Sequence, residues 1–257
     1  MENILTIESL EHFMEEISNI QDFTNLKGNF ERVLYRGQSD KYELIPSIGR
    51  IFEKNDLGNG KFENKLIPKQ TSDVEIQMLG YLKRVGFMLN EFDSDLDLLI
   101  KAQHYGMKTR LLDWTTNPLV ALFFAIKEEK YFDRDSYLYI LKVPKDFILE
   151  SKNHLYDSFN PFTINKTYVI RPRFNNNRVK AQSGWFTIHD TYQGYFIPLE
   201  KNPDMFKYMD IYKIPVKIKI DLLRKISDLG ANSRTIYADF EGLCTHANYK
   251  FHNMIKR

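Results

Sequence analysis

The residues best suited to chemistry in this sequence lie in one segment, residues 101–126. Its first half brings together amide, imidazole, hydroxyl, guanidinium, carboxylate and indole groups, on Gln103, His104, Tyr105, Thr109, Arg110, Asp113 and Trp114. Its second half is almost entirely apolar, which predicts a buried helix that begins at Asn117 and Pro118 and is capped by Thr115 or Thr116. The start of such a helix carries unpaired N–H groups that can bind an anion. The segment is therefore a candidate ligand site.

A purely structural role is the alternative for each of these residues, because buried polar groups usually satisfy one another. Arg110 and Asp113 can form a buried ion pair, since Leu111 and Leu112 draw this segment inward. In the same way, Trp114 can belong to the core and His104 can end a helix. For the group as a whole we favour a site, because clusters of desolvated ionisable groups concentrate at functional sites.

Two further stretches have the same polar character. In "YRGQSD", Tyr35, Arg36 and Gln38 surround Gly37, where the backbone can pass close to a ligand. In "NNRVKAQSGWFTI", a strand would place Arg178, Lys180, Gln182 and Gly184 on one face. The alternative for this second stretch is an edge strand with a solvated polar face. We expect Arg36, His104, Arg110, Asp113, Trp114 and Gln182 to converge on one cleft.

The remaining chain predicts the elements that must position these groups. Capping predicts a first helix that starts at Thr6 or Ser9, and helical spacing predicts further helices over residues 72–91, 94–104, 118–130, 221–230 and 237–252. Alternating or β-branched runs predict strands over residues 32–37, 136–144, 168–172, 185–189 and 211–218. Residues 53–65 are polar, contain two glycines and are expected to form a mobile loop. Helices come first and most strands later, so we predict a single α+β domain over residues 1–257, with N-terminal helices and a mostly antiparallel mixed sheet around a central buried helix.

Composition excludes several classes of protein. A net charge of +2 gives no global field to attract nucleic acid. The single cysteine, Cys244, rules out an internal disulfide and is expected to be a small core residue. Six histidines are scattered without the spacing of a metal site, so we expect no metal. No apolar run reaches the roughly 18 residues needed to span a bilayer, and the first residues do not resemble a secretion signal, so a cytoplasmic location without membrane contact is expected.

Three stretches together resemble the FRG domain family: "YRGQSD", "AQHYGMKTRLLDWTTNPLVALFFA" and "RVKAQSGWF". The clear motifs lie within residues 33–40, 102–126 and 178–186, and the family motif Phe/Tyr-Arg-Gly corresponds to Tyr35, Arg36 and Gly37. Residues 235–250 resemble the family's C-terminal helix without its usual proline. The resemblance implies kinship with proteins that are widespread in bacteria and phages, often with no assigned activity.

The order of the motifs is also similar to the layout of ADP-ribosyltransferase folds, as a likeness of arrangement and not of sequence. There, a first strand carries Arg or His, a second strand leads into a buried helix, and a third element carries Glu or Gln. This likeness implies NAD as cofactor, with catalytic roles for Arg36, Asp113 and Gln182. It implies cofactor-binding roles for Tyr35, Gln38, His104, Tyr105, Thr109, Arg110, Trp114 and Phe186. The acceptor would be a protein or a nucleic acid.

Two other functions stay open beside this transferase. One is a binding module that recognises a nucleotide or a nucleic-acid end without chemistry. Arg171, Arg173, Arg178 and Lys180 could form a basic strip for it, with Phe174 and Trp185 available for base stacking. The alternative for this strip is a solvated charged loop. The other function is an interaction domain in which the polar cluster only supports the core.

Overall fold

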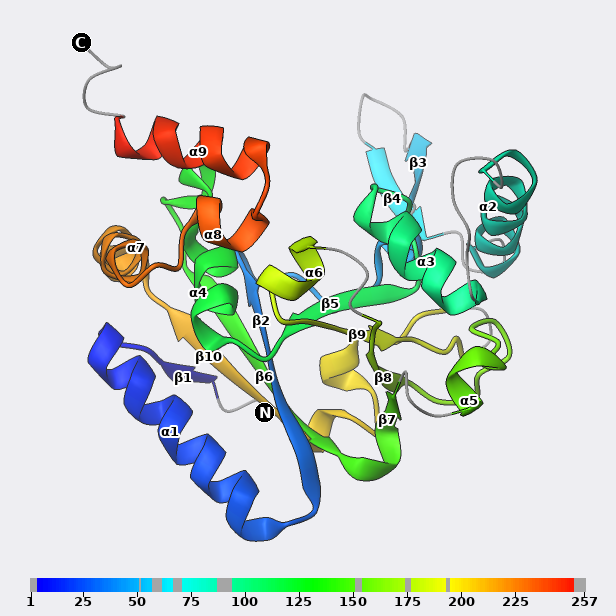
Figure 1. Cartoon of the computed structure of the whole chain (residues 1–257), viewed down its shortest axis with the longest axis horizontal. Coiled ribbons are helices and arrows are strands. Elements are labelled where there is room, and N and C mark those ends of the chain that lie inside the picture. Colours follow the sequence, from blue (N-terminus) through cyan, green and yellow to red (C-terminus); the bar gives the residue numbers. More distant parts are fainter. Residues whose placement is uncertain are drawn as a thin grey trace.

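The structure is a computed structural model that describes residues 4–50, 52–56, 62–66, 71–86, 94–150, 154–173, 177–192 and 195–251 (Figure 1). Its main sheet has eight strands in the order β1-β10-β6-β2-β5-β9-β8-β7. The outer pairs β1–β10 and β7–β8 are parallel, and the other pairs are antiparallel. The predicted α+β class with a mixed sheet is therefore confirmed.

The strands of this sheet are β1 (Ile4–Thr6), β2 (Phe30–Gln38), β5 (Leu111–Thr115), β6 (Ser136–Pro144), β7 (Ile148–Glu150), β8 (Tyr168–Arg171), β9 (Gly184–Ile188) and β10 (Met209–Ile214). A separate antiparallel pair is formed by β3 (Phe52–Asp56) and β4 (Phe62–Leu66). The expectation of a loop over residues 53–65 is therefore wrong for residues 53–56 and 62–65, which lie in these two strands.

The helices are α1 (Leu10–Lys27), α2 (Thr71–Gly86), α3 (Asp95–His104), α4 (Pro118–Ile126), α5 (His154–Asp157), α6 (Asn177–Ala181), α7 (Lys219–Asp228), α8 (Ser233–Tyr237) and α9 (Phe240–Lys250). In Figure 1, α1, α4, α7, α8 and α9 occupy one side of the molecule, and α2, α3 and α5 occupy the other. Among the described helices, none is both long enough and apolar enough to cross a membrane.

The central helix α4 forms as the sequence predicts. Six of its nine residues are buried, and they pack with α1, α7, β2, β6 and β10 in one core cluster. Its cap differs from the prediction. The Asn117 side chain accepts hydrogen bonds from the N–H groups of Leu119 and Val120, at 3.0 and 3.4 Å. Thr115 instead accepts a hydrogen bond from the Asn117 N–H, because it lies too early in the chain to reach the first turn. The helix start therefore has local partners for these two N–H groups.

At Gly37 the backbone of β2 lies close to helix α4. A Cβ atom at Gly37 would lie 1.9 Å from the carbonyl oxygen of Ala121 and 2.6 Å from the backbone nitrogen of Ala125. A ligand role of this glycine stays a prediction, because Gly37 also lines a cleft beside β2. Its missing side chain allows β2 and α4 to pack backbone against backbone.

Two other expectations are also wrong. Residues Arg178 to Ala181 lie in helix α6 and not in a strand, although the strand β9 begins shortly afterwards at Gly184. Their polar alternation was compatible with a strand, but Arg, Lys and Ala are good helix formers, and Val179 packs against Gly184 in this geometry. Cys244 is exposed on α9 and is not a core residue, because Gly242 is the buried position of that helix.

Candidate functional site

A cleft of about 480 Å³ opens where β2, β5 and the end of α3 meet. It brings together Arg36 and Gln38 from β2, His104 from α3, Asp113 from β5, and Gln182 from the turn after α6. We call it the Arg36 cleft. Residues that are far apart in the sequence become neighbours because β2 and β9 both lie beside β5 in the sheet.

Arg36 and Gln38 each present a buried polar atom without a hydrogen-bond partner. Nη1 of Arg36 donates to the carbonyl oxygen of Asp113 at 2.6 Å, whereas its Nε has no partner. Gln38 is 7% exposed, and its Oε1 also has no partner. In the part of the chain that the structure describes, these are the buried side-chain atoms left unsatisfied. Leaving such atoms unpaired costs about 1–3 kcal/mol each. A ligand with both a hydrogen-bond acceptor and a donor would remove this cost.

The Asp113 carboxylate is held by a short chain of side chains. Thr109 donates from its hydroxyl to Oε1 of Gln103. This fixes the amide, so that Nε2 of Gln103 donates to Oδ1 of Asp113 at 2.9 Å. No lysine or arginine of the described residues forms an ion pair with this exposed carboxylate. Asp113 therefore offers a negative charge that is oriented but not neutralised.

Positive groups outnumber negative ones around the cleft. Arg36, Arg50, Lys127 and Arg178 line it, against the carboxylates of Asp113 and Glu128. The side chain of Glu128 pairs with Lys127 at 3.4 Å and with Lys130 at 3.2 Å. The cleft therefore has an excess of positive charge that favours an anionic ligand.

Burial changes the protonation of groups in the cleft. It lowers the pKa of Arg36, and the nearby Asp113 carboxylate opposes that shift. Arginine nevertheless stays charged near neutral pH. Burial, helped by the positive charge of Arg178, also lowers the pKa of His104, which is therefore neutral near pH 7. The charge available to a ligand thus comes from arginine and not from histidine.

Comparison with known families assigns this part of the chain. Residues 31–134 match the family model of the FRG domain. This segment of the chain is an FRG domain. The match includes Arg36, Gln38, His104 and Asp113, whereas Gln182 lies beyond its end. Neither the search of curated proteins nor that of solved structures found a match.

Four residues predicted to bind a cofactor lie outside the cleft of this FRG domain. Tyr105 is 76% exposed and borders a groove between α2 and α3. Phe186 packs into a core cluster with α3 residues. Thr109 is buried, and its backbone N–H binds the Ser47 hydroxyl at 3.0 Å. Arg110 is the fourth, so its predicted place in the shared cleft is wrong.

Arg110 also does not pair with Asp113. It is 1% exposed, and its Nε donates to Oε2 of Glu75 at 2.7 Å. Its backbone N–H donates to Oε1 of the same carboxylate at 2.7 Å. Arg110 precedes β5, which begins at Leu111, and its side chain is buried beside α2, whereas the Asp113 side chain within β5 is exposed and lines the Arg36 cleft. The prediction that both residues are buried is therefore confirmed for Arg110 and wrong for Asp113, which is exposed. Of the two predicted kinds of partner for Arg110, the ion pair with Asp113 is wrong, and the backbone is confirmed by its hydrogen bond to the Pro161 carbonyl oxygen.

The aromatic residues Trp114 and Tyr35 line the cleft but belong mainly to the core. Trp114 is 3% exposed, and its indole N–H donates to the Thr187 hydroxyl at 3.0 Å. Tyr35 is 1% exposed and packs with α4. Tyr42 and Phe124, which sequence reasoning did not select, also line the cleft, and Tyr42 is exposed. These two rings are therefore better placed to contact a flat ligand.

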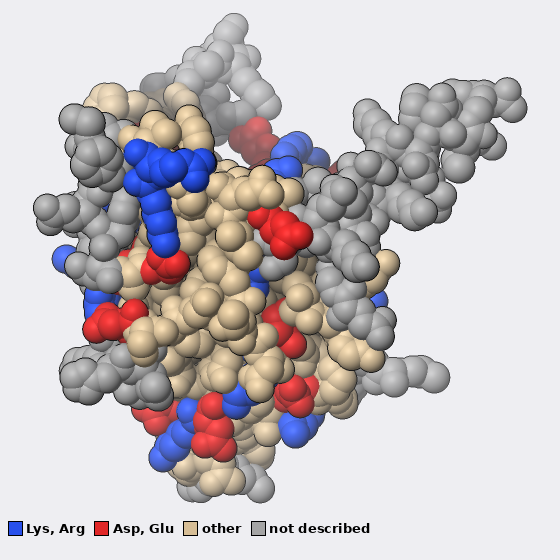
Figure 2. Space-filling view, turned by 90° about the vertical axis from the view of Figure 1, so that its right-hand side faces the viewer, with Lys and Arg blue, Asp and Glu red and all other residues tan. Residues whose placement is uncertain are grey.

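The predicted basic strip is divided in the structure: Arg171 and Lys180 line one cavity together with Trp185, whereas Arg173 and Arg178 do not line it. Arg173 forms ion pairs with Asp97 and Asp157, and Arg178 lies over the Tyr237 ring at 4.5 Å. Phe174 lies outside the described residues. Figure 2 shows one side of the molecule, where basic and acidic groups are interspersed around a broad uncharged area. No extended basic surface is visible on the described part of that side.

Sequence reasoning missed several residues of the site. Arg50 and Lys127 line the cleft but lie outside the motifs. Outside the cleft, it also missed Glu75 of α2, which pairs with the buried Arg110 and lies 35 positions before it. Gln103 was noted in the motif, but its role in holding Asp113 was not. The signal available for Glu75 was a carboxylate within the apolar stripe of α2, which normally requires a buried cation.

Proposed function

We propose that this FRG domain is an NAD-dependent ADP-ribosyltransferase-like enzyme that binds NAD in the Arg36 cleft. The observation that carries the proposal is the pair of buried, unpartnered atoms, Nε of Arg36 and Oε1 of Gln38. Nε of Arg36 can only donate a hydrogen bond, and Oε1 of Gln38 can only accept one. A dinucleotide offers phosphate oxygens as acceptors and ribose hydroxyls or a carboxamide as donors, so it satisfies both atoms at once.

The surroundings support a ligand of this kind. The excess of arginine and lysine suits a pyrophosphate, which guanidinium groups bind strongly. The rings of Tyr42 and Phe124 supply faces or edges for a base or nicotinamide. The volume of about 480 Å³ lies within the range of small-molecule sites.

The chemistry would use Asp113 and Gln182. The C–N bond between nicotinamide and ribose breaks, and its electron pair leaves with the nicotinamide nitrogen. The positive charge that develops on the ribose is stabilised by the Asp113 carboxylate, which Gln103 holds in place. Gln182 would bind a ribose hydroxyl. An acceptor nucleophile then attacks the ribose carbon and loses its proton, which the Asp113 carboxylate would accept.

The first test measures binding. Arg36→Ala and Gln38→Leu are each compared with wild type by calorimetry with NAD, and Arg224→Ala on α7 serves as the control. Arg224 is an exposed arginine in a surface ion pair with Asp221, so its loss removes the same charge away from the cleft. We expect both cleft variants to lose at least tenfold in affinity and the control to match wild type. The absence of NAD binding to folded wild-type protein at millimolar NAD would reject the proposal.

The second test measures transfer. Labelled NAD is incubated with wild type, Asp113→Asn and Gln182→Ala, with cell extract and nucleic acid as acceptors. We expect transfer by wild type, with turnover reduced more than binding in both variants, because these contacts strengthen in the transition state.

A nucleotide-binding module without chemistry is the second candidate. The observation that favours it is the neutral side chain of Gln182, since an amide lacks the charge that stabilises a cationic transition state. In addition, the Gln182 backbone carbonyl accepts a hydrogen bond from the Thr115 hydroxyl at 2.6 Å, which gives the residue a structural role as well. Binding of NAD without any transfer would support this candidate over the enzyme.

A further inference from the structure

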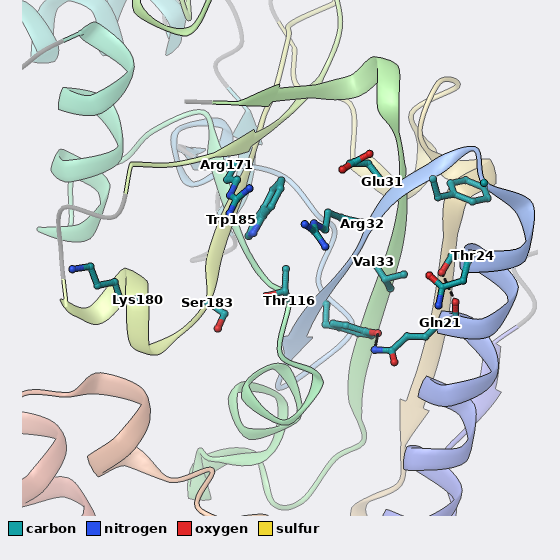
Figure 3. Close-up of a pocket in the computed structure, with 14 residues that line it drawn as sticks. Gln21, Thr24, Glu31, Arg32, Val33, Thr116, Arg171, Lys180, Ser183 and Trp185 are labelled. Atoms are coloured by element: carbon teal, nitrogen blue, oxygen red, sulfur yellow. Dashed lines mark hydrogen bonds between the residues drawn. The ribbon is translucent and has the colours of Figure 1, made fainter. Parts of the chain in front are cut away.

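A second and larger cavity lies on the other side of Tyr35 from the Arg36 cleft. It measures about 770 Å³ and lies between α1 and β2 on one side and β8, α6 and β9 on the other (Figure 3). We call it the split-sheet cavity. Among the described residues that line the two cavities, Tyr35 is the one they share. The split-sheet cavity is therefore a separate site from the Arg36 cleft proposed for NAD.

The cavity exists because a strand is missing from the sheet at this place. β2 pairs with β6 from Phe30 to Gln38, but it pairs with β5 only through Tyr35 and Thr115. The chain leaves β5 after Thr115 and turns into α4. Residues 30–34 of β2 consequently have no described strand neighbour on the β5 side. Such an edge presents backbone N–H and C=O groups that can pair with another chain.

The charged side chains around this open edge are mainly basic. Arg32 extends from β2 toward Trp185, and Lys180 lies on α6 at the other side of the opening (Figure 3). Both are exposed, and the structure gives neither a hydrogen bond nor an ion pair with any described residue. Arg171 adds a third positive charge and lies over the Trp185 ring at 5.9 Å. Glu31 is the one carboxylate among the lining residues.

The wall opposite β2 is held in a fixed shape. Ser183 has a φ angle of 48°, in the left-handed region that non-glycine residues rarely adopt. Its carbonyl oxygen accepts a hydrogen bond from the Thr116 N–H at 3.2 Å, and its own N–H donates to the Lys180 carbonyl at 3.1 Å. Strained residues of this kind persist where the surrounding structure fixes them, and they cluster at functional sites. The cavity wall is therefore formed before any partner binds.

We propose that the split-sheet cavity binds an extended acidic segment of a partner protein, which adds as a strand to residues 30–34 of β2. The peptide backbone would pair with the open edge, which is a known mode of peptide recognition. Five residues of β2 span about 17 Å, enough for two or three side chains on each face of the added strand. Acidic side chains would meet Arg32 and Lys180, and an apolar one would meet the Trp185 ring. A nucleic acid could meet the cations, but it has no backbone that can complete the sheet.

The test uses synthetic octapeptide pools. The first pool has glutamate at every second position and random residues between, and the second has lysine in place of glutamate. A third pool equals the first, except that alternate peptide nitrogens are methylated, which blocks strand pairing without changing the charge. Binding to wild type is compared with binding to Arg32→Glu/Lys180→Glu. Lys207→Glu/Lys217→Glu changes the net charge equally at exposed sites that line neither cavity and serves as the control.

We expect the glutamate pool to bind wild type and the control alike, and to bind the Arg32→Glu/Lys180→Glu variant at least tenfold more weakly. The lysine and methylated pools should also bind wild type at least tenfold more weakly. Amide hydrogen exchange of residues 30–34 should slow when the glutamate pool is bound, and NAD binding should not change in the charge-reversal variant. Equal binding of the glutamate and methylated pools, or no slowing at residues 30–34, would overturn the proposal. Tighter binding of an octameric oligothymidine than of the glutamate pool would overturn it in favour of nucleic acid.

Discussion

Replacing Glu75 with alanine is expected to destabilise this protein by about 3–5 kcal/mol, although Glu75 lies on a peripheral helix. Glu75 is 0% exposed, and its two carboxylate oxygens bind the backbone N–H and the Nε of Arg110, both at 2.7 Å. The guanidinium of Arg110 also donates to the carbonyl oxygen of Pro161 at 2.9 Å and lies 4.8 Å from the Phe162 ring. Removing the carboxylate leaves a buried positive charge and a buried backbone donor, which together account for this loss.

The pair is tested by a double-mutant cycle in urea. Glu75→Leu and Arg110→Met should each cost about 3–5 kcal/mol, whereas the double variant should cost less than either, because two apolar side chains leave no buried charge behind. Glu43→Ala is the control, since it breaks the exposed ion pair with Lys201 and should cost at most about 1 kcal/mol.

The pH dependence of this cycle provides an independent check. Burial raises the pKa of Glu75, and Arg110 opposes that shift. In Arg110→Met this opposition is lost, so the folded-state pKa rises further above the unfolded value. Stability then falls as the pH rises through the folded pKa, and the variant should regain part of its loss on mild acidification relative to wild type. Additive effects of the two single substitutions, or a Glu75→Ala protein as stable as wild type, would refute this account of the pair.

Three further substitutions test other parts of the fold. Gly37→Ala should lower the free energy of unfolding by about 1–3 kcal/mol, the range typical of overpacking, because its Cβ would clash with the Ala121 carbonyl oxygen. A thermal melt equal to that of wild type would contradict this. Burial lowers the pKa of His189 to about 3, so below about pH 6.5 the unfolded chain binds a proton that the folded protein does not. The free energy of unfolding should therefore fall by about 1.4 kcal/mol per pH unit below that pH. Urea titrations at several pH values should show a flatter slope for His189→Gln. Asn117→Ala should cost about 1 kcal/mol through loss of the α4 cap, whereas Thr116→Ala should not remove the cap; equal stability losses in urea would contradict the assignment.

The elements with strong local signals could be predicted from the sequence alone. The strand Ser136–Pro144 forms over the predicted residues, because a run of β-branched and aromatic residues favours an extended chain. Of the two predicted caps of the first helix, Thr6 and Ser9, the structure selects Ser9, whose side chain accepts a hydrogen bond from the His12 N–H. The apolar residues of α4 predicted a buried helix because they surround it almost completely. In each case the sequence signal lies in residues that are close neighbours along the chain.

Pairings between distant residues could not be predicted in this way. The sequence predicted an ion pair between Arg110 and Asp113, because both are charged and close along the chain. In the structure, Arg110 pairs with Glu75 instead. In the same way, alternation predicted a strand at residues 178–182, but packing of Val179 against Gly184 selects a helix there. Local patterns allow several partners, and only the arrangement of the sheet selects one.

The candidate site shows the same division. The sequence by itself determined that Arg36, Gln38, His104 and Asp113 are unusual polar residues beside buried elements, because their types conflict with the apolar residues around them. The predicted convergence on one cleft is confirmed for Arg36, His104, Asp113, Trp114 and Gln182. Only the tertiary structure decided that Arg110, which was predicted to join them, lies elsewhere. The physical reason is that strand order in a sheet depends on long-range pairing, here β2 beside β5 beside β9, which no local propensity encodes.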